Sequence, residues 1–160
     1  MTEKTFTHLD AEGGLHMVDI SSKASTRRVA RAACVVVVSG APAGTVTRTL
    51  ENHVVQSARL AGIQAAKRTA ELIPLCHPLS LSQVLLDIAE HPRGYEVRSE
   101  VTTQGQTGVE MEALTACGFA ALTLVNSLIE EASGVHVEDL VLVHKSGGKS
   151  GEWGRDVATP

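Results

Sequence analysis

ARLAGIQAAKRTAELIPLCHPLSLSQV, residues 58–84, is the stretch around which the rest of the chain is organised. It begins as a helix of small residues, and small side chains let another backbone approach closely. It ends in IPLCHP, where Pro74 and Pro78 prevent a regular helix. Cys76 and His77 therefore lie on a turn framed by two prolines, which is a rigid place to hold a catalytic or binding group.

Each of these residues also has an ordinary structural interpretation. Lys67 and Arg68 stand near the end of the helix, where the helix dipole favours cations, so they could be plain C-terminal charges. Cys76 could be a small buried apolar residue, and His77 could be a hydrogen-bonded structural one. The combination of cations, a proline-framed histidine and a following strand favours a functional site, and both interpretations stay open at this point.

The composition excludes several classes of protein. A chain of 160 residues suits one domain with a sizeable core, and with only four aromatic residues that core must be aliphatic. The net charge of −4 argues against a nucleic-acid surface, which needs a basic stripe. An anionic ligand would instead need a local concentration of Lys and Arg.

The cysteines and the apolar runs indicate the compartment. Cys34, Cys76 and Cys117 are far apart and form no CxxC pair, so neither a disulfide framework nor a zinc site is indicated. No apolar run reaches the roughly 18 residues of a membrane span, and the N-terminus lacks the apolar core of a signal peptide. We therefore expect a reduced, soluble, cytoplasmic protein that acts on neither membrane nor nucleic acid.

The order of the predicted elements indicates the fold class. Periodicity and turn signals predict strands at 29–38, 81–89, 95–103 and 137–144 and helices at 46–69 and 109–131. Strand, helix, strand, strand, helix, strand is the split βαβ, ferredoxin-like pattern: an α+β fold with an antiparallel sheet and two helices on one face. Residues 1–28 are expected to form an N-terminal arm, 29–153 a single domain and 154–160 a disordered tail, which we expect to begin near Trp153. Gly134 is a plausible left-handed cap of the second helix.

The segment TGVEMEALTA, residues 107–116, is a second candidate for chemistry. Thr107 and Glu110 have the spacing of a capping box, so Glu110 could simply cap the helix. If the chain is still extended through 108–111, Glu110 and Glu112 share one side and Met111 faces inward. Two carboxylates at such a junction could perform acid–base chemistry or hold a guanine-type edge. In mid-helix they would point apart, and both interpretations remain open.

The segment HKSGGKSGEW, residues 144–153, is a third candidate. Its glycines permit positive φ angles, and successive N–H groups could form an anion-binding nest flanked by Lys145 and Lys149. It is not a Walker A loop, because Val143 stands where the first glycine is required and no helix follows. A solvated loop is the alternative.

Four segments together, HMVDIS, ARLAGIQAAKRTAELIPLCHPL, TGVEMEAL and HKSGGKSG, resemble the MoaC family, the cyclic pyranopterin monophosphate synthase accessory proteins of molybdenum cofactor biosynthesis. The resemblance runs from about Thr7 to Trp153. It implies a ferredoxin-like subunit in a homohexamer, a trimer of dimers, with active sites between subunits. The implied substrate is 3′,8-cyclo-7,8-dihydro-GTP, converted to cyclic pyranopterin monophosphate with release of pyrophosphate. No metal or organic cofactor is expected.

The resemblance also implies roles for individual residues. His77 matches the catalytic histidine of the family, Glu110 and Glu112 match its acidic pair, and Cys76 and Met111 match residues that line the pocket. The cations matched to the triphosphate end are Lys23, Arg28, Lys145 and Lys149, and Lys67 and Arg68 belong to the signature as well.

Three positions depart from the family pattern. Asn126 stands where the family has Asp, Ile129 where it has Lys, and Glu51 where a second Lys is expected. We keep Asn126 as a catalytic candidate because its amide can still accept a hydrogen bond. One positioned acid or base contributes typically about 10²–10⁴ in rate, so the loss of lysines matters. Three hypotheses follow: a lyase that makes cyclic pyranopterin monophosphate, a catalytically impaired paralogue that binds a purine nucleotide or joins a mixed hexamer, and a related reaction on another phosphorylated purine.

Overall fold

A computed structural model describes residues 8–10, 12–41, 45–46 and 53–155 of the chain. The elements are β1 (Thr26–Ser39), α2 (His53–Lys67), α3 (Thr69–Leu72), β2 (Leu81–His91), β3 (Gly94–Gly105), α4 (Glu110–Leu128), β4 (Gly134–Ser146) and β5 (Trp153–Gly154).

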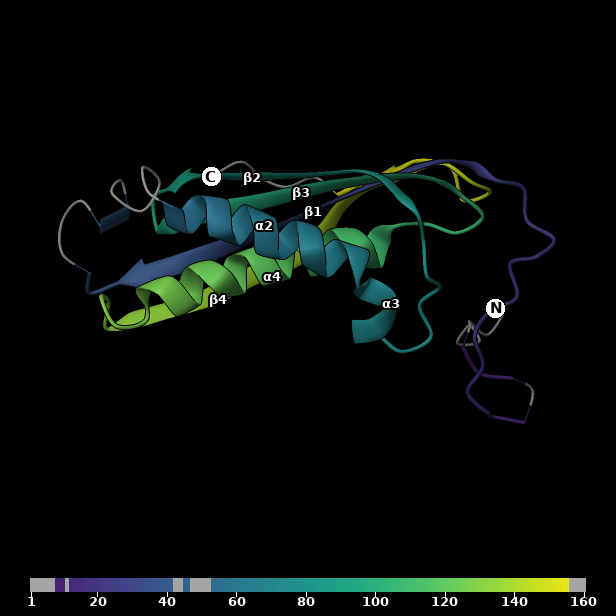
Figure 1. The fold of residues 1–160 in the computed structure, drawn as a ribbon, viewed down its shortest axis with the longest axis horizontal. Coiled ribbons are helices and arrows are strands. Elements are labelled where there is room, and N and C mark those ends of the chain that lie inside the picture. Colours follow the sequence, from purple (N-terminus) through teal and green to yellow (C-terminus); the bar gives the residue numbers. More distant parts are fainter. Residues whose placement is uncertain (1–7, 11, 42–44, 47–52, 156–160) are drawn as a thin grey trace.

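The strands form one sheet in the order β2-β3-β1-β4-β5, and every neighbouring pair is antiparallel. β1 lies at the centre, between β3 and β4, which come later in the chain. α2 and α4 pack against each other and against the same face of the sheet (Figure 1). The predicted α+β, ferredoxin-like architecture, an antiparallel sheet with two helices on one face, is confirmed.

The core between the sheet and the helices is aliphatic, as the composition requires. Its largest fully buried side chains include Val36 and Val101 from the sheet and Leu124 and Leu128 from α4. Tyr95, at the start of β3, is also fully buried. On β1, Ala30, Cys34 and Val36 are fully buried under the helices, whereas Arg31 is exposed and Ala33 lines a hollow on the open face of the sheet. The sequence predicts a strand buried on both faces, and that prediction is wrong, because helices cover only one face.

The small residues of α2 do allow a close approach. A Cβ atom added at Gly62 would lie 2.6 Å from the carbonyl oxygen of Ala116 and 3.2 Å from the Cβ of Ala120, both on α4, and would collide with Leu86 of β2. Gly62 therefore sits where α2, α4 and the sheet meet. This contact therefore limits how α2 can lie along α4.

The predicted helix over 46–69 is in fact interrupted. Within the described residues it runs from His53 to Lys67, and Arg68 leaves helical geometry with φ −113° and ψ 12° before the short α3 begins. The Thr69 hydroxyl donates to the carbonyl oxygens of Ala65 and Ala66, at 3.4 and 3.0 Å. A hydroxyl that binds these carbonyls competes with the regular helical ladder, which explains the break.

Two predictions, one about the end of α4 and one about the C-terminal tail, are wrong. Gly134 is not a left-handed cap, because α4 ends at Leu128 and Gly134 already begins β4 without a positive φ. The tail is not disordered at its start either: Trp153 and Gly154 pair with Lys145 and His144. Without β5, the outer edge of β4 would leave backbone groups unpaired there. Residues 156–160 of the predicted tail lie outside the described part of the chain.

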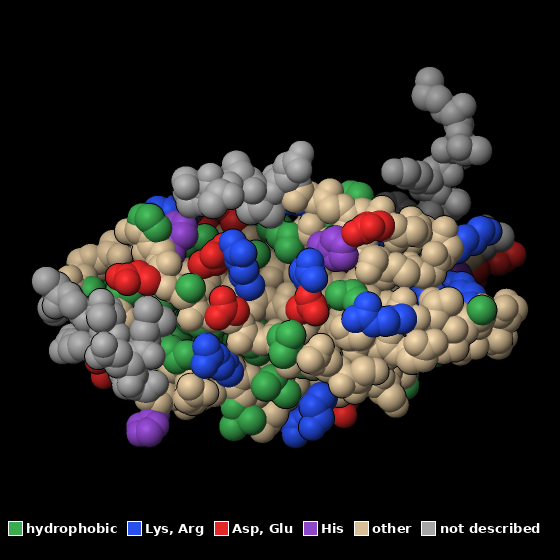
Figure 2. Space-filling view, turned by 90° about the horizontal axis from the view of Figure 1, so that it is seen from above, with side chains coloured by type: hydrophobic (Ala, Val, Ile, Leu, Met, Phe, Trp, Pro, Cys, Tyr) green, Lys and Arg blue, Asp and Glu red, His purple; other side chains and the backbone are tan. Residues whose placement is uncertain are grey.

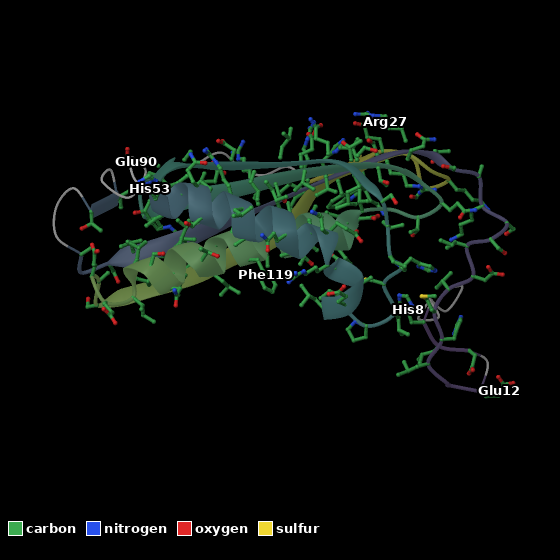
Figure 3. All side chains as sticks on the ribbon, viewed as in Figure 1. His8, Glu12, Arg27, His53, Glu90 and Phe119 are labelled. Carbon is green, nitrogen blue, oxygen red and sulfur yellow. The ribbon has the colours of Figure 1, made fainter. Side chains whose placement is uncertain are left out.

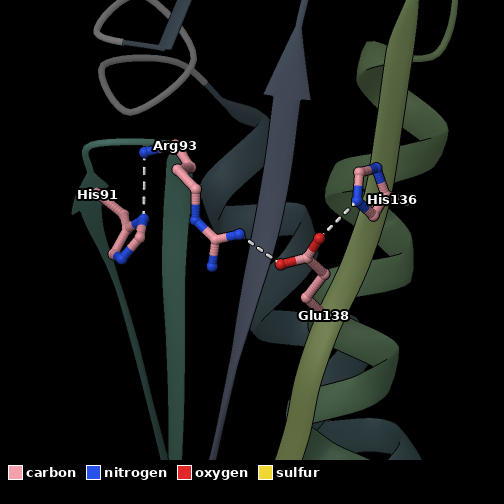
Figure 4. Close-up of polar contacts among 4 residues, drawn as sticks. All are labelled: His91, Arg93, His136 and Glu138. Atoms are coloured by element: carbon pink, nitrogen blue, oxygen red, sulfur yellow. Dashed lines mark hydrogen bonds and ion pairs between the residues drawn. The ribbon is translucent and has the colours of Figure 1, made fainter. Parts of the chain in front are cut away.

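A polar cluster ties the sheet together at the end where β2 turns into β3 (Figure 4). Arg93, in that turn, reaches across to Glu138 on β4, with Nη1 and Oε2 2.5 Å apart. His136 Nε2 lies 2.9 Å from the other oxygen of Glu138. The hydrogen bond from His136, followed by that from Arg93, lowers the pKa of Glu138. Because the cluster is exposed, we expect it to contribute little to stability.

Candidate active site

The loop between α3 and β2 holds the proline-framed turn in a defined conformation. Leu75 adopts a φ of +65°, a left-handed conformation that costs energy for a residue with a branched side chain. The backbone N–H of Cys76 donates to the carbonyl of Ile73 at 3.3 Å. The turn thus presents Cys76 and His77 toward the N-terminal end of α4.

The start of α4 differs from the predicted capping box. The N-cap is Val109, with no side-chain hydrogen bond, and Glu110 is already the first helical residue. A capping box needs its Glu three positions after the cap, so Thr107 and Glu110 cannot form one. Instead, Glu110 forms an ion pair with Lys145, whose Nζ lies 3.1 Å from the Glu110 Oε1 atom.

Of the two alternatives left open for Glu110 and Glu112, the extended backbone through 108–111 does not occur, because α4 already begins at Glu110. Met111, which the extended alternative would turn inward, is 36% exposed, whereas Glu112 is only 4% exposed. Helical geometry turns consecutive residues by about 100°, so the side chains fan out from the first turn of α4. All three still reach one hollow, because it lies at the very end of the helix.

That hollow, which we call the carboxylate pocket, has a volume of about 270 Å³. It is lined by His8, Leu75, Cys76, His77, Leu79, Thr107, Gly108, Glu110, Met111 and Glu112. Five residues that the sequence singled out, in two segments more than 30 positions apart, therefore lie in one place. His8 is a functional candidate that sequence reasoning missed.

Glu112 has the most unusual electrostatics in this pocket. Burial is the main cause that raises the pKa of Glu112 from its ordinary value of 4.5 to about 7. A backbone hydrogen bond opposes this shift, and the charge of the nearby Glu110 carboxylate adds to it. Burial, and then the charge of Glu112, also raises the pKa of the Cys76 thiol. A carboxyl group that titrates near neutral pH can both accept and donate a proton in a cell.

A second hollow, which we call the basic trough, continues from the carboxylate pocket. Its volume is about 410 Å³, and it shares Thr107, Gly108 and Glu110 with the first. Lys23, Arg28 and Lys149 line it together with Gln106 and Ser150. A small adjoining recess brings in Lys145 beside Arg28.

The basic trough is held by backbone contacts. The Arg28 guanidinium donates to the carbonyl oxygens of Gly105 and Gln106 at 3.0 and 3.2 Å, and Gln106 donates to the carbonyl of Lys23 at 3.0 Å. Gly147 and Gly148 have φ angles of +95° and +72°, and a Cβ at either would collide with the segment that carries Arg28. The Gly-rich loop is thus folded tightly against that segment.

Some predicted residues lie elsewhere in the single chain. Lys67 lines a separate hollow beside β2, and Arg68 lines none of the hollows described here.

Asn126 is exposed on α4, and at 1.5 Å per residue it lies roughly 20 Å along the helix from Glu112. Ile129, 61% exposed, follows the last residue of α4. Glu51 lies outside the described residues. Asn126 can therefore join His77 only through another subunit.

A larger hollow of about 860 Å³ lies on the open face of the sheet, away from these residues. Ion pairs cross it, among them Arg31 with Glu100 and Arg98 with Glu96. Seen from above, this side of the molecule carries acidic, basic and hydrophobic side chains interspersed (Figure 2). No sign of charge dominates there, in contrast to the basic trough.

Known proteins match nearly the whole chain. The model of the MoaC family matches residues 17–148. The chain belongs to the MoaC family. A cyclic pyranopterin monophosphate synthase of Nostoc sp. is 47% identical over 151 residues, which are 92% of this chain and 90% of that protein. Synthases of the same name from Trichodesmium erythraeum and Methylobacterium nodulans are 44% and 46% identical, over 94% and 92% of this chain and 93% and 94% of theirs.

Two further observations bear on cofactors and membranes. Among the described residues, no three His, Cys, Asp or Glu side chains are grouped so that they could hold a metal ion. Within the same residues, α4 is long and apolar enough to cross a membrane by length and composition. It nevertheless packs against β1, β3 and β4 and buries one apolar face, with Leu124 and Leu128, in the core, as the central helix of a globular domain does.

Proposed function

We propose that this protein is a lyase of molybdenum cofactor biosynthesis that converts 3′,8-cyclo-7,8-dihydro-GTP into cyclic pyranopterin monophosphate and releases pyrophosphate. The observation that carries the proposal is the continuity of two unlike hollows. The carboxylate pocket holds Glu112, whose pKa is raised to about 7, beside His77, and the basic trough adjoins it through Thr107 and Gly108. A molecule with a heterocycle at one end and a triphosphate at the other fits that division.

The basic trough is suited to the phosphates. Lys23, Arg28 and Lys149 line it, and Lys145 stands where it meets the carboxylate pocket, paired with Glu110. The net charge of the chain is −4, so this is the local concentration of cations that an anionic ligand requires. Cations at the phosphates would stabilise the negative charge that develops on departing pyrophosphate.

The carboxylate pocket is suited to proton transfer at the heterocycle. Glu112 exists in both protonation states near neutral pH, so it can pass a proton to a reacting atom or take one from it. His77 lies in the same pocket, on a turn that Pro74 and Pro78 stiffen. We assign Glu112 and His77 the acid–base roles and Glu110 the role of orienting Lys145.

We further propose a cytoplasmic homohexamer, a trimer of dimers, in which a second subunit completes each site. Apolar side chains exposed on the outer surfaces of α2 and α4 support an interface there: Leu60, Phe119 and Leu122. Figure 3 shows Phe119 pointing away from the sheet. An interface at this surface would also bury Asn126, which cannot reach the site of its own chain.

The test is incubation of the purified protein with the cyclic GTP-derived intermediate, with pyrophosphate and the pterin product both measured. We expect both to form in equal amounts, and we expect the variant His77→Ala to lose product formation while it still binds GTP. Lys145→Ala should weaken GTP binding more than His77→Ala does. Binding without turnover in the native protein would support the catalytically impaired paralogue instead.

A further inference from the structure

Residues 8–10 and 12–16 are held together as a small hairpin, and His8 at its start lines the carboxylate pocket beside the proline-framed turn. Leu9 bridges to Leu15, and the N–H of His16 donates to the carbonyl oxygen of His8 at 3.1 Å. The carboxylate of Asp10 closes the turn by accepting the N–H groups of Gly14 and Glu12, at 2.6 and 3.1 Å. The position of His8 is thus set by hydrogen bonds on both sides of the turn.

The hairpin brings the side chain of His8 to the carboxylate pocket. His8 lines that pocket together with His77, Cys76 and Glu112, and Figure 3 shows it beside the loop that follows α3. It does not line the basic trough. Within the described part of the chain, the His8 ring forms no hydrogen bond or ion pair, and the residue is exposed.

We propose that His8 is a substrate-contacting residue of this site, placed at its heterocycle end by the hairpin; this rests on the proposed function. An imidazole can donate from one nitrogen and accept at the other, which matches the alternating donors and acceptors on the edge of a guanine-derived ring. His77, on the proline-framed turn, lines the same pocket, so two imidazoles from separate segments are available where the ring would lie. No lysine or arginine lines the carboxylate pocket among the described residues.

The experiment compares two probes on four proteins by calorimetry. GTP carries a guanine ring and a triphosphate, whereas inorganic tripolyphosphate carries only the phosphates. We expect His8→Ala to bind GTP about five- to tenfold more weakly than the native protein, which is the effect of losing one hydrogen bond. Its affinity for tripolyphosphate should equal that of the native protein. His16→Ala is the matched control, because it lies on the same hairpin, keeps its backbone bond and does not line the pocket. His8→Gln, which keeps a donor and an acceptor, should recover most of the loss.

The outcomes separate this inference from the proposed function. Native protein that binds GTP no better than tripolyphosphate overturns both. If the native protein binds GTP better than tripolyphosphate, and both His8→Ala and His16→Ala bind the two probes as the native protein does, only the role of His8 is overturned. Equal weakening of both probes by His8→Ala also overturns it, since the hairpin would then act on the phosphates. Each variant is compared with the native protein by circular dichroism before it is titrated.

Discussion

At the scale of single residues, the proposed acid–base chemistry rests on one buried carboxyl group, that of Glu112. Glu112 lies at the first turn of a helix, where the dipole favours negative charge, yet burial outweighs that and raises its pKa to about 7. The folded chain therefore holds a proton that the unfolded chain would release near pH 4.5. Burial of this carboxyl group lowers the stability of the fold near neutral pH, and it gives the pocket a group that titrates at the pH of the cell.

Glu112→Gln should separate stability from activity. Because the folded-state pKa of this acid is raised, native stability falls as pH rises from about 4.5 through about 7 and then levels off. The glutamine variant has no such proton to lose. Its free energy of unfolding, relative to that of the native protein, should therefore rise over that pH window by on the order of 2–3 kcal/mol. Thermal unfolding at a series of pH values measures this, and activity should be lost throughout, since an amide cannot transfer the proton.

Glu130→Gln, in the exposed turn that follows α4, is the control for that series. It should follow the native protein at every pH. If the stability difference between Glu112→Gln and the native protein were the same at pH 5 and pH 8, Glu112 would not have the raised pKa on which its acid–base role depends.

The site could be predicted from the sequence only in part, and the reason lies in individual residues. The prolines around Cys76 and His77 are local signals and identified the turn correctly. Which of Glu110 and Glu112 is buried depends on where α4 begins, and that is decided by packing against the sheet rather than by the Thr107 spacing. His8 was missed, although Asp10 followed by two glycines is a turn signal that could have placed a hairpin there.

At the scale of the elements, the alternation of strand and helix was predictable and the ends were not. The apolar periodicity of α4 and the β-branched run of β1 reflect burial, which the sequence records directly. The break at Arg68, by contrast, depends on a hydroxyl of Thr69 that binds carbonyls one turn back. β5 forms because the outer edge of β4 is free to pair with it, and which strand lies at the edge of the sheet cannot be read from the local sequence.

Gly62→Ala tests the close contact between α2 and α4. Alanine is intrinsically better in a helix by about 1 kcal/mol, but here its Cβ would lie 2.6 Å from the backbone carbonyl of Ala116. Overpacking of this kind typically costs about 1–3 kcal/mol, so a net loss of stability is expected in chemical denaturation. Gly118→Ala on α4 is the matched control, because its Cβ would meet only the flexible end of Leu140, at 3.3 Å. That variant should be neutral or more stable, and a stabilised Gly62→Ala would show that the helices have room to move apart.

At the scale of the whole molecule, one chain contains only part of the proposed site. The carboxylate pocket and the basic trough lie at one end of α4, while Asn126 and Ile129 lie at the other, roughly 20 Å away. Both residues are exposed, and the apolar Leu122 and Phe119 are exposed on the same helix. An assembly that covers this helix would bring the second group into the site of a neighbour. Light scattering that shows a monomer at micromolar concentration would contradict the proposed hexamer.

The departures from the family pattern provide the sharpest test of that composite site. A lysine can donate a proton and stabilise the charge of a leaving phosphate, and an aspartate one turn away can hold it in place. Ile129 follows Asn126 by three positions, so their side chains project from nearly the same side and make that surface apolar. The resemblance sets Glu51 where the family has a second Lys, and a negative charge in that role would repel a polyanion. We therefore expect the native chain to turn over slowly.

The combined change Glu51→Lys, Asn126→Asp and Ile129→Lys should raise turnover of the cyclic intermediate, by up to the factor of about 10²–10⁴ that one positioned acid or base typically supplies. Each single change should do little, because groups that act as a unit are non-additive. The gain must come from a neighbouring subunit, since residues 126 and 129 lie far from His77 of their own chain. Dilution that dissociates the assembly should therefore abolish the gain while tripolyphosphate binding persists in the separated chains. Fast turnover by the native protein, with no gain in the triple variant, would mean that this chain moves its protons with the groups already in the carboxylate pocket.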